Sequence, residues 1–90
     1  MIDELAWCAV RYALGRMTYV SHSVPRAVLY YKDRLETFTL KGIIRDIEEH
    51  KRIYGAIGMD CDERSWFEFR DKLIEEVEGR EHGKRETLRN

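Results

Sequence analysis

The residues best suited to recognise a ligand lie close together in the first third of the chain. Arginine forks and aromatic rings bind phosphate, carboxylate and nucleobase groups. The candidates are Arg11, Tyr12, Arg16, Tyr19, His22 and Arg26. In a structural alternative, the tyrosines are core aromatics with surface hydroxyls, and the arginines pair with carboxylates such as Asp46 or Glu48. The residues alone do not decide between a binding site and a structural cluster.

Other reactive side chains do not combine into a catalytic or metal site. Two cysteines and two histidines could supply a Cys₂His₂ set, but their spacing is not that of a zinc site. They are Cys8, His22, His50 and Cys61. The carboxylate pairs at 48–49 and 75–76 are helix neighbours that point in different directions, so we interpret them as solvated surface charges. The sequence contains no Gly-rich phosphate loop, HExxH motif or serine elbow. We therefore expect a non-enzymatic protein with no metal and no cofactor.

Length, composition and charge restrict the class of protein further. Ninety residues form one domain, and 43% hydrophobic with 37% charged residues suits a compact core inside a charged shell. The net charge of −1 gives no general attraction to nucleic acid or membrane. No apolar run reaches the roughly 18 residues of a membrane span, and the acidic start, Met1 to Glu4, is unlike a signal peptide. With Cys8 expected in the core and Cys61 in a loop, we expect a reducing, intracellular compartment.

The longest mostly apolar run, residues 6–20, predicts a central helix from about Ile2 to Leu14, with Gly15 as its C-terminal break. Leu5, Ala9 and Ala13 should pack inward. The small residues at positions 6, 9 and 13 would let another helix approach closely. We therefore expect the rest of the chain to cover this first helix.

Three amphipathic segments follow, at about 23–35, 37–54 and 61–77, and Gly79 should end the last. These patterns predict an all-α single domain, a bundle of about four helices packed around the N-terminal helix. It should comprise residues 1–79, and 80–90 should be a charged flexible tail. The predicted core cluster includes Leu5, Trp7, Tyr12, Ile44, Ile47, Trp66 and Leu73.

Arg11 and Arg16 are five positions apart, or about 140° around a helix. At least one should therefore lie along a contact between helices, with its charged head on a carboxylate. Asp46 is the preferred partner, because it sits among the isoleucines of the third predicted helix.

The segment Cys-Ala-Val-Arg-Tyr-Ala-Leu-Gly-Arg-Met-Thr-Tyr, residues 8–19, is also distinctive. It resembles the opening of small phage- and prophage-encoded proteins of uncharacterised function, with Arg11, Tyr12, Gly15, Arg16, Thr18 and Tyr19 matching position by position. The stretch at 43–47 and the helix around Trp66 extend this resemblance to about residues 5–78. The resemblance implies phage origin and a place in the host bacterial cytoplasm.

The charge distribution completes the functional hypothesis. Residues 1–35 carry five basic and three acidic side chains, and residues 62–78 carry three basic and seven acidic ones. We expect a non-enzymatic phage accessory protein that binds a host or phage protein, such as an inhibitor or modulator of a host or anti-phage defence protein. A nucleic-acid-binding regulator that uses the basic front is the alternative, and an oligomeric phage structural component is a third. A homo-oligomer remains open.

Overall fold

In the computed structural model, residues 2–16, 23–54 and 63–89 are described, and almost all of them are helical. The elements are α1 (Ile2–Arg16), α2 (Ser23–Tyr30), the 3₁₀ helix η1 (Lys32–Arg34), α3 (Thr37–Tyr54) and α4 (Glu63–Arg89). No described residue belongs to a strand. The predicted all-α bundle of four helices is therefore confirmed.

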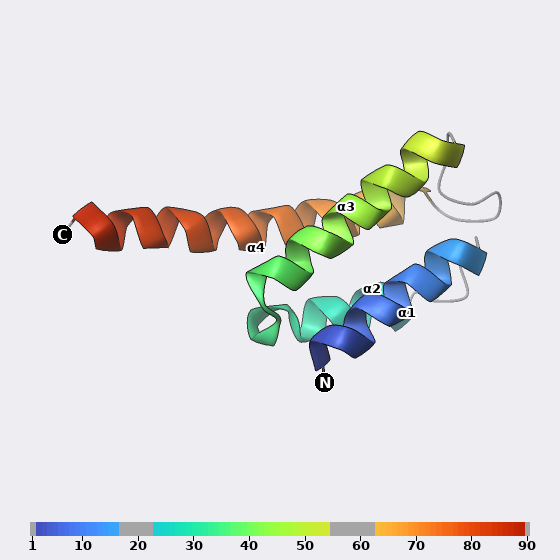
Figure 1. Cartoon of the computed structure of the whole chain (residues 1–90), viewed down its shortest axis with the longest axis horizontal. Helices are drawn as coiled ribbons and strands as arrows, with labels where there is room; N and C mark the ends of the chain where they lie inside the picture. The colour runs from blue at the N-terminus through green and yellow to red at the C-terminus, as the bar shows by residue number, and fades with distance from the viewer. Residues whose placement is uncertain (1, 17–22, 55–62, 90) are drawn as a thin grey trace.

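The helices form a bundle in which α1 packs against both α2 and α3, while α4 packs against α3 and α2. Figure 1 shows α3 crossing α4, with α1 and α2 running alongside each other on the same side. The molecule measures 49 × 27 × 17 Å. Its long dimension follows α4, whose C-terminal end projects beyond the other helices.

The core is densest where α3 meets α4. Amphipathic patterning predicts this interface correctly, because each helix is apolar on one face only. The buried apolar residues of the two helices are Leu40, Ile43, Ile47, Trp66, Phe69, Leu73 and Val77. Of the predicted cluster, Ile47, Trp66 and Leu73 are buried, and Trp7 and Ile44 are half-buried.

Two members of the predicted core cluster are misplaced. Leu5 is 71% exposed and Tyr12 is 67% exposed. The buried residues of α1 are instead Val10, Ala13 and Leu14. Cys8, expected in the core, is exposed as well. α1 is thus rotated about its own axis relative to the prediction, because its contact with α3 fixes which side faces inward.

The predicted end of the last helix is also wrong, since α4 continues through Gly79 to Arg89. A glycine inside a helix costs only about 1 kcal/mol, and tertiary contacts lie directly after it. Arg80 donates to Thr37 Oγ1 at 3.1 Å and to the Lys32 carbonyl oxygen at 2.8 Å. Glu81 forms an ion pair with Lys41 at 2.7 Å. The expected boundary between a domain at 1–79 and a tail at 80–90 therefore falls inside a continuous helix.

A smaller difference concerns the C-terminal end of α1, whereas the expected absence of a membrane-spanning helix agrees with the described residues. The first helix runs to Arg16, two residues beyond the predicted end at Leu14. Within the described part of the chain, no helix is both long enough and apolar enough to cross a membrane. Cys61 and the predicted turn around Gly55 and Gly58 lie outside the described residues.

Candidate functional site: the outer face of α1 and its groove with α2

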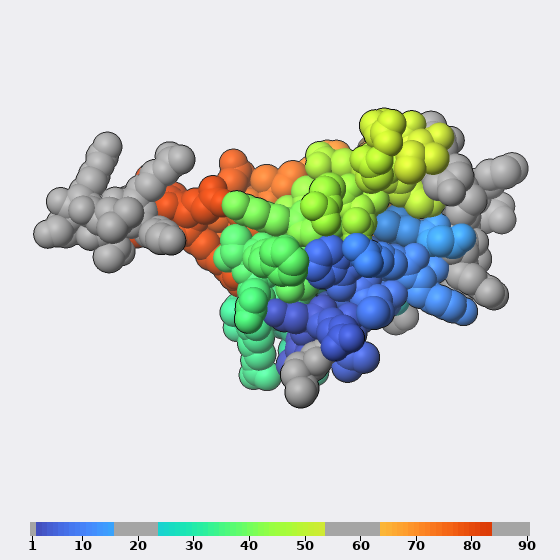
Figure 2. Space-filling view, in the orientation of Figure 1, coloured from blue at the N-terminus to red at the C-terminus, as the bar shows by residue number. Residues whose placement is uncertain are grey.

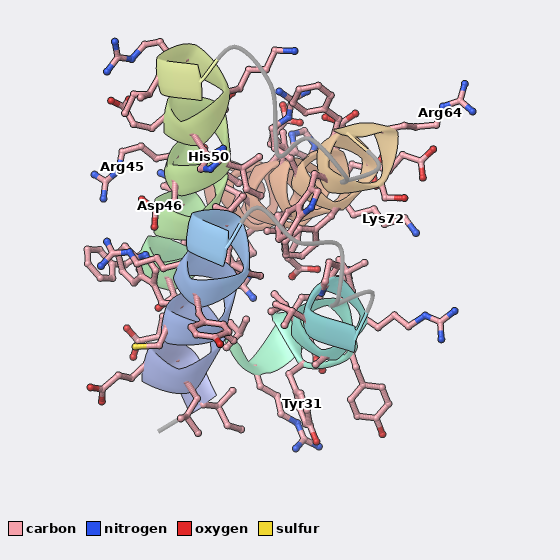
Figure 3. All side chains as sticks on the ribbon, turned by 90° about the vertical axis from the view of Figure 1, so that its right-hand side faces the viewer. Tyr31, Arg45, Asp46, His50, Arg64 and Lys72 are labelled. Carbon is pink, nitrogen blue, oxygen red and sulfur yellow. The ribbon has the colours of Figure 1, made fainter. Side chains whose placement is uncertain are left out.

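Of the six predicted binding residues, the structure describes the side chains of three, and it does not bring these three together. Arg11 and Tyr12 lie on α1, and Arg26 is exposed on α2. Figure 3 shows α2 and α3 on different sides of α1, and Arg11 bonds to α3. The backbone of Arg16 ends α1, but its side chain lies outside the described part. Tyr19 and His22 lie outside it entirely.

Arg11 instead takes part in a contact that fixes the rotation of α1. Its Nε donates to Asp46 Oδ2 at 2.9 Å, and its guanidinium lies 4.7 Å from the centre of the Trp7 ring. Trp7 Nε1 donates to the same carboxylate oxygen. The predicted pairing of an α1 arginine with Asp46 is therefore confirmed for Arg11. Figure 3 shows Asp46 projecting from α3 beside α1.

A glycine lets α1 approach α3 at this point. Gly42 is buried one turn before Asp46, and a Cβ at position 42 would overlap the six-membered ring of Trp7. The indole therefore packs directly against the α3 backbone at position 42, where only glycine leaves room. Phe38 completes the cluster, since its ring meets Trp7 edge-on at 5.4 Å. These contacts make the Trp7 side of α1 its α3-facing side.

This contact explains why Leu5 and Tyr12 are exposed. Leu5 lies two residues before Trp7, which is about 200° around the helix. Once Trp7 faces α3, Leu5 must point away from it. Tyr12 lies seven residues after Leu5 and falls on nearly the same side. We call the resulting row the outer seam: the exposed Ile2, Leu5 and Tyr12 and the half-buried Ala9, which was expected to pack inward. Figure 2 shows α1 largely uncovered on the face of the molecule turned to the viewer.

The outer seam borders an apolar groove between α1 and α2, with a volume of about 500 Å³. α1 contributes Ile2, Leu5, Ala6 and Ala9 to its lining, and α2 contributes Val24, Ala27 and Val28. Tyr31, which directly follows α2, completes it. Every lining side chain is apolar or aromatic. Three of the lining residues are alanines, while Leu5 is exposed and Val28 is buried. Such a groove can bury apolar side chains, and the phenolic hydroxyl of Tyr31 is the one polar side-chain atom among its lining residues.

The Tyr31 end of the groove is held by surrounding contacts. The Tyr30 and Tyr31 rings meet edge-on at 4.9 Å, and the Arg34 guanidinium lies 5.9 Å from the Tyr31 ring centre. The next residue, Lys32, anchors η1 to α4 through an ion pair with Glu76 at 2.9 Å. Hydrogen bonds from Lys32 and Arg80 lower the pKa of the Glu76 carboxyl. The wall that Tyr31 forms is therefore fixed from both sides.

A second hollow, of about 460 Å³, lies on the other side of α1 and faces α3. Carboxylates and aromatic rings line it together. Asp3 is engaged there, because its oxygens lie 3.4 Å from the Glu36 backbone N–H just before α3. Arg11 and Trp7 also belong to this hollow and hold α1 to Asp46. Its polar groups therefore serve the α1–α3 contact.

In the part of the chain that the structure describes, metal-type residues do not gather into a second site, and three of the exposed basic residues lie on opposite sides of the molecule. Figure 3 shows Arg45 projecting on the opposite side of the molecule from Arg64 and Lys72. Of the four residues considered for zinc, Cys8 is exposed on α1 and His50 is buried on α3. The other two, His22 and Cys61, lie outside the described residues. No group of three metal-type side chains occurs among the described ones.

Sequence reasoning found Tyr12 but assigned it the wrong environment, and it missed the groove. A usable signal was present, because the outer seam has intervals of three, four and three residues, the spacing of contact positions in paired helices. Comparison of the chain with protein-family models, curated proteins and solved structures gives no match.

Proposed function

We propose that this is a non-enzymatic accessory protein that acts by binding another protein through the outer seam and the α1–α2 groove. The observation that carries the proposal is the open apolar groove of about 500 Å³ beside an exposed leucine and tyrosine. Contiguous exposed apolar surface on a small protein is typical of an interaction site. The resemblance of residues 8–19 to phage proteins supports a host or phage protein as the partner, met in the host cytoplasm.

The shape of the groove favours one recognition mode. Two helices border it, three of its lining residues are alanines, and its α1 lining extends from Ile2 to Ala9. An amphipathic helix laid in such a groove would bury its apolar stripe between α1 and α2. Binding would then cover a site on the partner by occupying its helix, which fits the action of an inhibitor or modulator.

The electrostatics support protein rather than nucleic acid as the partner. Two basic residues of the predicted front are engaged with carboxylates: Arg11 with Asp46 and Lys32 with Glu76. The net charge of −1 adds no general attraction to phosphate. If nucleic acid were bound tightly at physiological salt, the doubly substituted Arg26→Ala, Lys32→Ala protein would lose that binding.

A capture experiment with a groove variant tests the proposal. Tagged wild-type protein, the groove variant Ala27→Glu and the control Glu75→Lys are incubated with lysate of phage-infected cells, with and without nuclease. Ala27 and Glu75 are both exposed, so neither change disturbs the core. We expect a protein that wild type and Glu75→Lys retain after nuclease treatment and that Ala27→Glu loses. Capture that is equal for all three baits would reject the groove, and capture that nuclease abolishes would favour the nucleic-acid alternative.

A further inference from the structure

We propose that the hollow between α1 and α3 receives an arginine side chain of the docked partner protein. This space of about 460 Å³, on the side of α1 that faces α3, is called here the α1–α3 hollow. The inference rests on the proposed function and deepens it, because it states the chemistry of a second contact with the same partner. The groove would bury apolar side chains of that partner, and the hollow would hold its positive charge.

Carboxylates make the α1–α3 hollow negatively charged. Asp3, Glu4 and Glu36 line it together with a single guanidinium, that of Arg11. Arg11 is already paired with Asp46, which is not part of the lining. In the described part of the chain no cation pairs with Asp3 or Glu36, and Asp3 accepts from the Glu36 backbone N–H instead. The hollow therefore retains negative charge that an incoming cation can neutralise.

Two aromatic rings supply the second feature that a guanidinium recognises. Trp7 and Phe38 both line the hollow, and their rings meet edge-on at 5.4 Å. Phe38 is 69% exposed, so an incoming group can reach its ring. The face of an aromatic ring attracts cations, and the planar guanidinium of arginine stacks on such faces, whereas the ammonium group of lysine is a compact, strongly hydrated charge. The rings therefore favour arginine over lysine.

The protein already holds one guanidinium in this way. That of Arg11 lies 4.7 Å from the centre of the Trp7 ring, and its Nε donates to Asp46 at 2.9 Å. The hollow contains a second aromatic ring and a second carboxylate, those of Phe38 and Glu36. Among the described residues, no cation lies over Phe38 or pairs with Glu36. The internal contact of Arg11 thus indicates which kind of group the rest of the hollow suits.

The hollow also offers acceptors for the several N–H donors of a guanidinium. Thr39 is 3% exposed and lines the hollow from α3, and no other described residue bonds to its side chain. A carboxylate has about four acceptor positions, so Asp3 keeps most of its own after the contact with the backbone N–H. Asp3, Glu36 and Thr39 together provide both the charge and the hydrogen-bond acceptors that a guanidinium needs.

The α1–α3 hollow borders the outer seam, so one partner can contact both. Cys8 lines the hollow and follows Leu5 by three residues, which is about 60° around the helix. Glu4, the residue directly before Leu5, lines the hollow as well. A partner that covers the outer seam therefore has the hollow at the edge of its contact surface.

A titration with one isolated arginine side chain tests the site. Nα-acetyl-argininamide is added to isotope-labelled protein up to about 50 mM at constant ionic strength, and the indole N–H signals are followed by nuclear magnetic resonance. The Trp7 signal should shift saturably, with a dissociation constant in the millimolar range. The signal of Trp66, which is buried in the core, should stay in place. The neutral isostere Nα-acetyl-citrullinamide should leave the Trp7 signal unchanged.

Two variants and a control locate the binding. Glu36→Gln removes a charge but keeps the backbone N–H that donates to Asp3, and Phe38→Leu removes the exposed ring. Each should raise the dissociation constant of the arginine compound at least about threefold. Glu75→Gln, on an exposed position of α4, is the matched control and should bind as the wild type does. An unchanged Trp66 signal in each variant shows that the core is intact.

Three results of the titration would overturn the inference: no shift of the Trp7 signal, an equal shift with the citrulline compound, or a dissociation constant that neither Glu36→Gln nor Phe38→Leu changes. In the capture experiment, Glu36→Gln should retain less of the protein that Ala27→Glu loses. Full retention by Glu36→Gln would mean that the hollow binds only free cations, which would overturn its assignment to the partner. Failure of the titration while Ala27→Glu still loses the captured protein would reject the hollow and keep the docking groove.

Discussion

Leu73 and Leu5 show how differently two parts of this small protein use the same side chain. Leu73 lies where α4 meets α3 and is fully buried, whereas Leu5 lies on the outer seam and is 71% exposed. The α3–α4 interface is closed because each helix has one apolar face and a charged opposite face. α1 has more apolar side chains than its contacts with α2 and α3 bury, since Leu5 and Tyr12 stay exposed. The surplus apolar surface is what makes α1 and its groove a candidate for docking.

The largest effect on stability is expected when the α3–α4 interface loses Trp66, which is the largest fully buried side chain. Trp66→Ala should cost about 3–5 kcal/mol of unfolding free energy, because it leaves a cavity beside Phe69 that the helices cannot close. Chemical denaturation followed by circular dichroism measures the effect, with Trp66→Phe as the milder comparison. An unchanged denaturation midpoint for Trp66→Ala would show that the α3–α4 interface is not the stable centre of the fold.

A second prediction concerns Asp46, the link between the two regions. Asp46→Ala removes the acceptor of both Trp7 Nε1 and Arg11 Nε. Arg11 is 59% exposed and regains water, so the main penalty is the half-buried indole N–H, and we expect a loss of about 1–3 kcal/mol. Glu49→Ala breaks an exposed pair with Arg52 on the same helix and should leave the midpoint unchanged.

The Asp46 contact also marks how far the sequence could predict this molecule. The buried faces of α3 and α4 could be predicted from periodicity, because apolar residues recur on one side of each helix, with Ile43 and Leu73 among them. The pairing of Arg11 with Asp46 followed from the need of an arginine near the core for a carboxylate. The rotation of α1 about its axis could not be predicted from the sequence, because apolar residues occur on more than one side of this helix. Only the structure shows that Trp7 shares Asp46 with Arg11 and so turns Leu5 outward. The exposure of Leu5 and the groove depend on that rotation.

The other main difference between prediction and structure, the continuation of α4, has a similar cause. Local sequence indicates a stop at Gly79, and only long-range contacts argue against it. Arg80 reaches the Lys32 carbonyl and Thr37, which are more than forty positions away in the chain. Sequence patterning near position 79 contains no information about those partners.

A third prediction concerns the ionic contact that holds η1 to α4 beside the groove. Lys32 and Arg80 lower the pKa of Glu76 below its ordinary value of 4.5, so the charged form stabilises the fold at neutral pH. This contribution is lost as the pH falls through the lowered pKa. Glu76→Gln should cost about 1 kcal/mol or less at pH 7, and its difference from the wild type should narrow steadily below pH 4.5. Glu75→Gln, a change to the exposed neighbouring carboxylate, is the matched control and should leave the unfolding free energy at pH 7 within about 0.5 kcal/mol of wild type.

The smallest effect on stability is expected at Leu5, and it returns to the comparison of the two leucines. Leu73→Ala should cost about 2–5 kcal/mol, because it opens a cavity in the core. Leu5→Ala removes an exposed side chain and inserts the best helix former, so in dilute solution its unfolding free energy should stay within about 0.5 kcal/mol of wild type.

If the outer seam binds a second copy, the wild-type thermal midpoint should rise with protein concentration by mass action, and that of Leu5→Ala should rise less. Thermal denaturation of both variants at low and high concentration therefore separates the two regions. A dilute Leu5→Ala protein as unstable as Leu73→Ala would mean that Leu5 belongs to the core and that the open face does not exist.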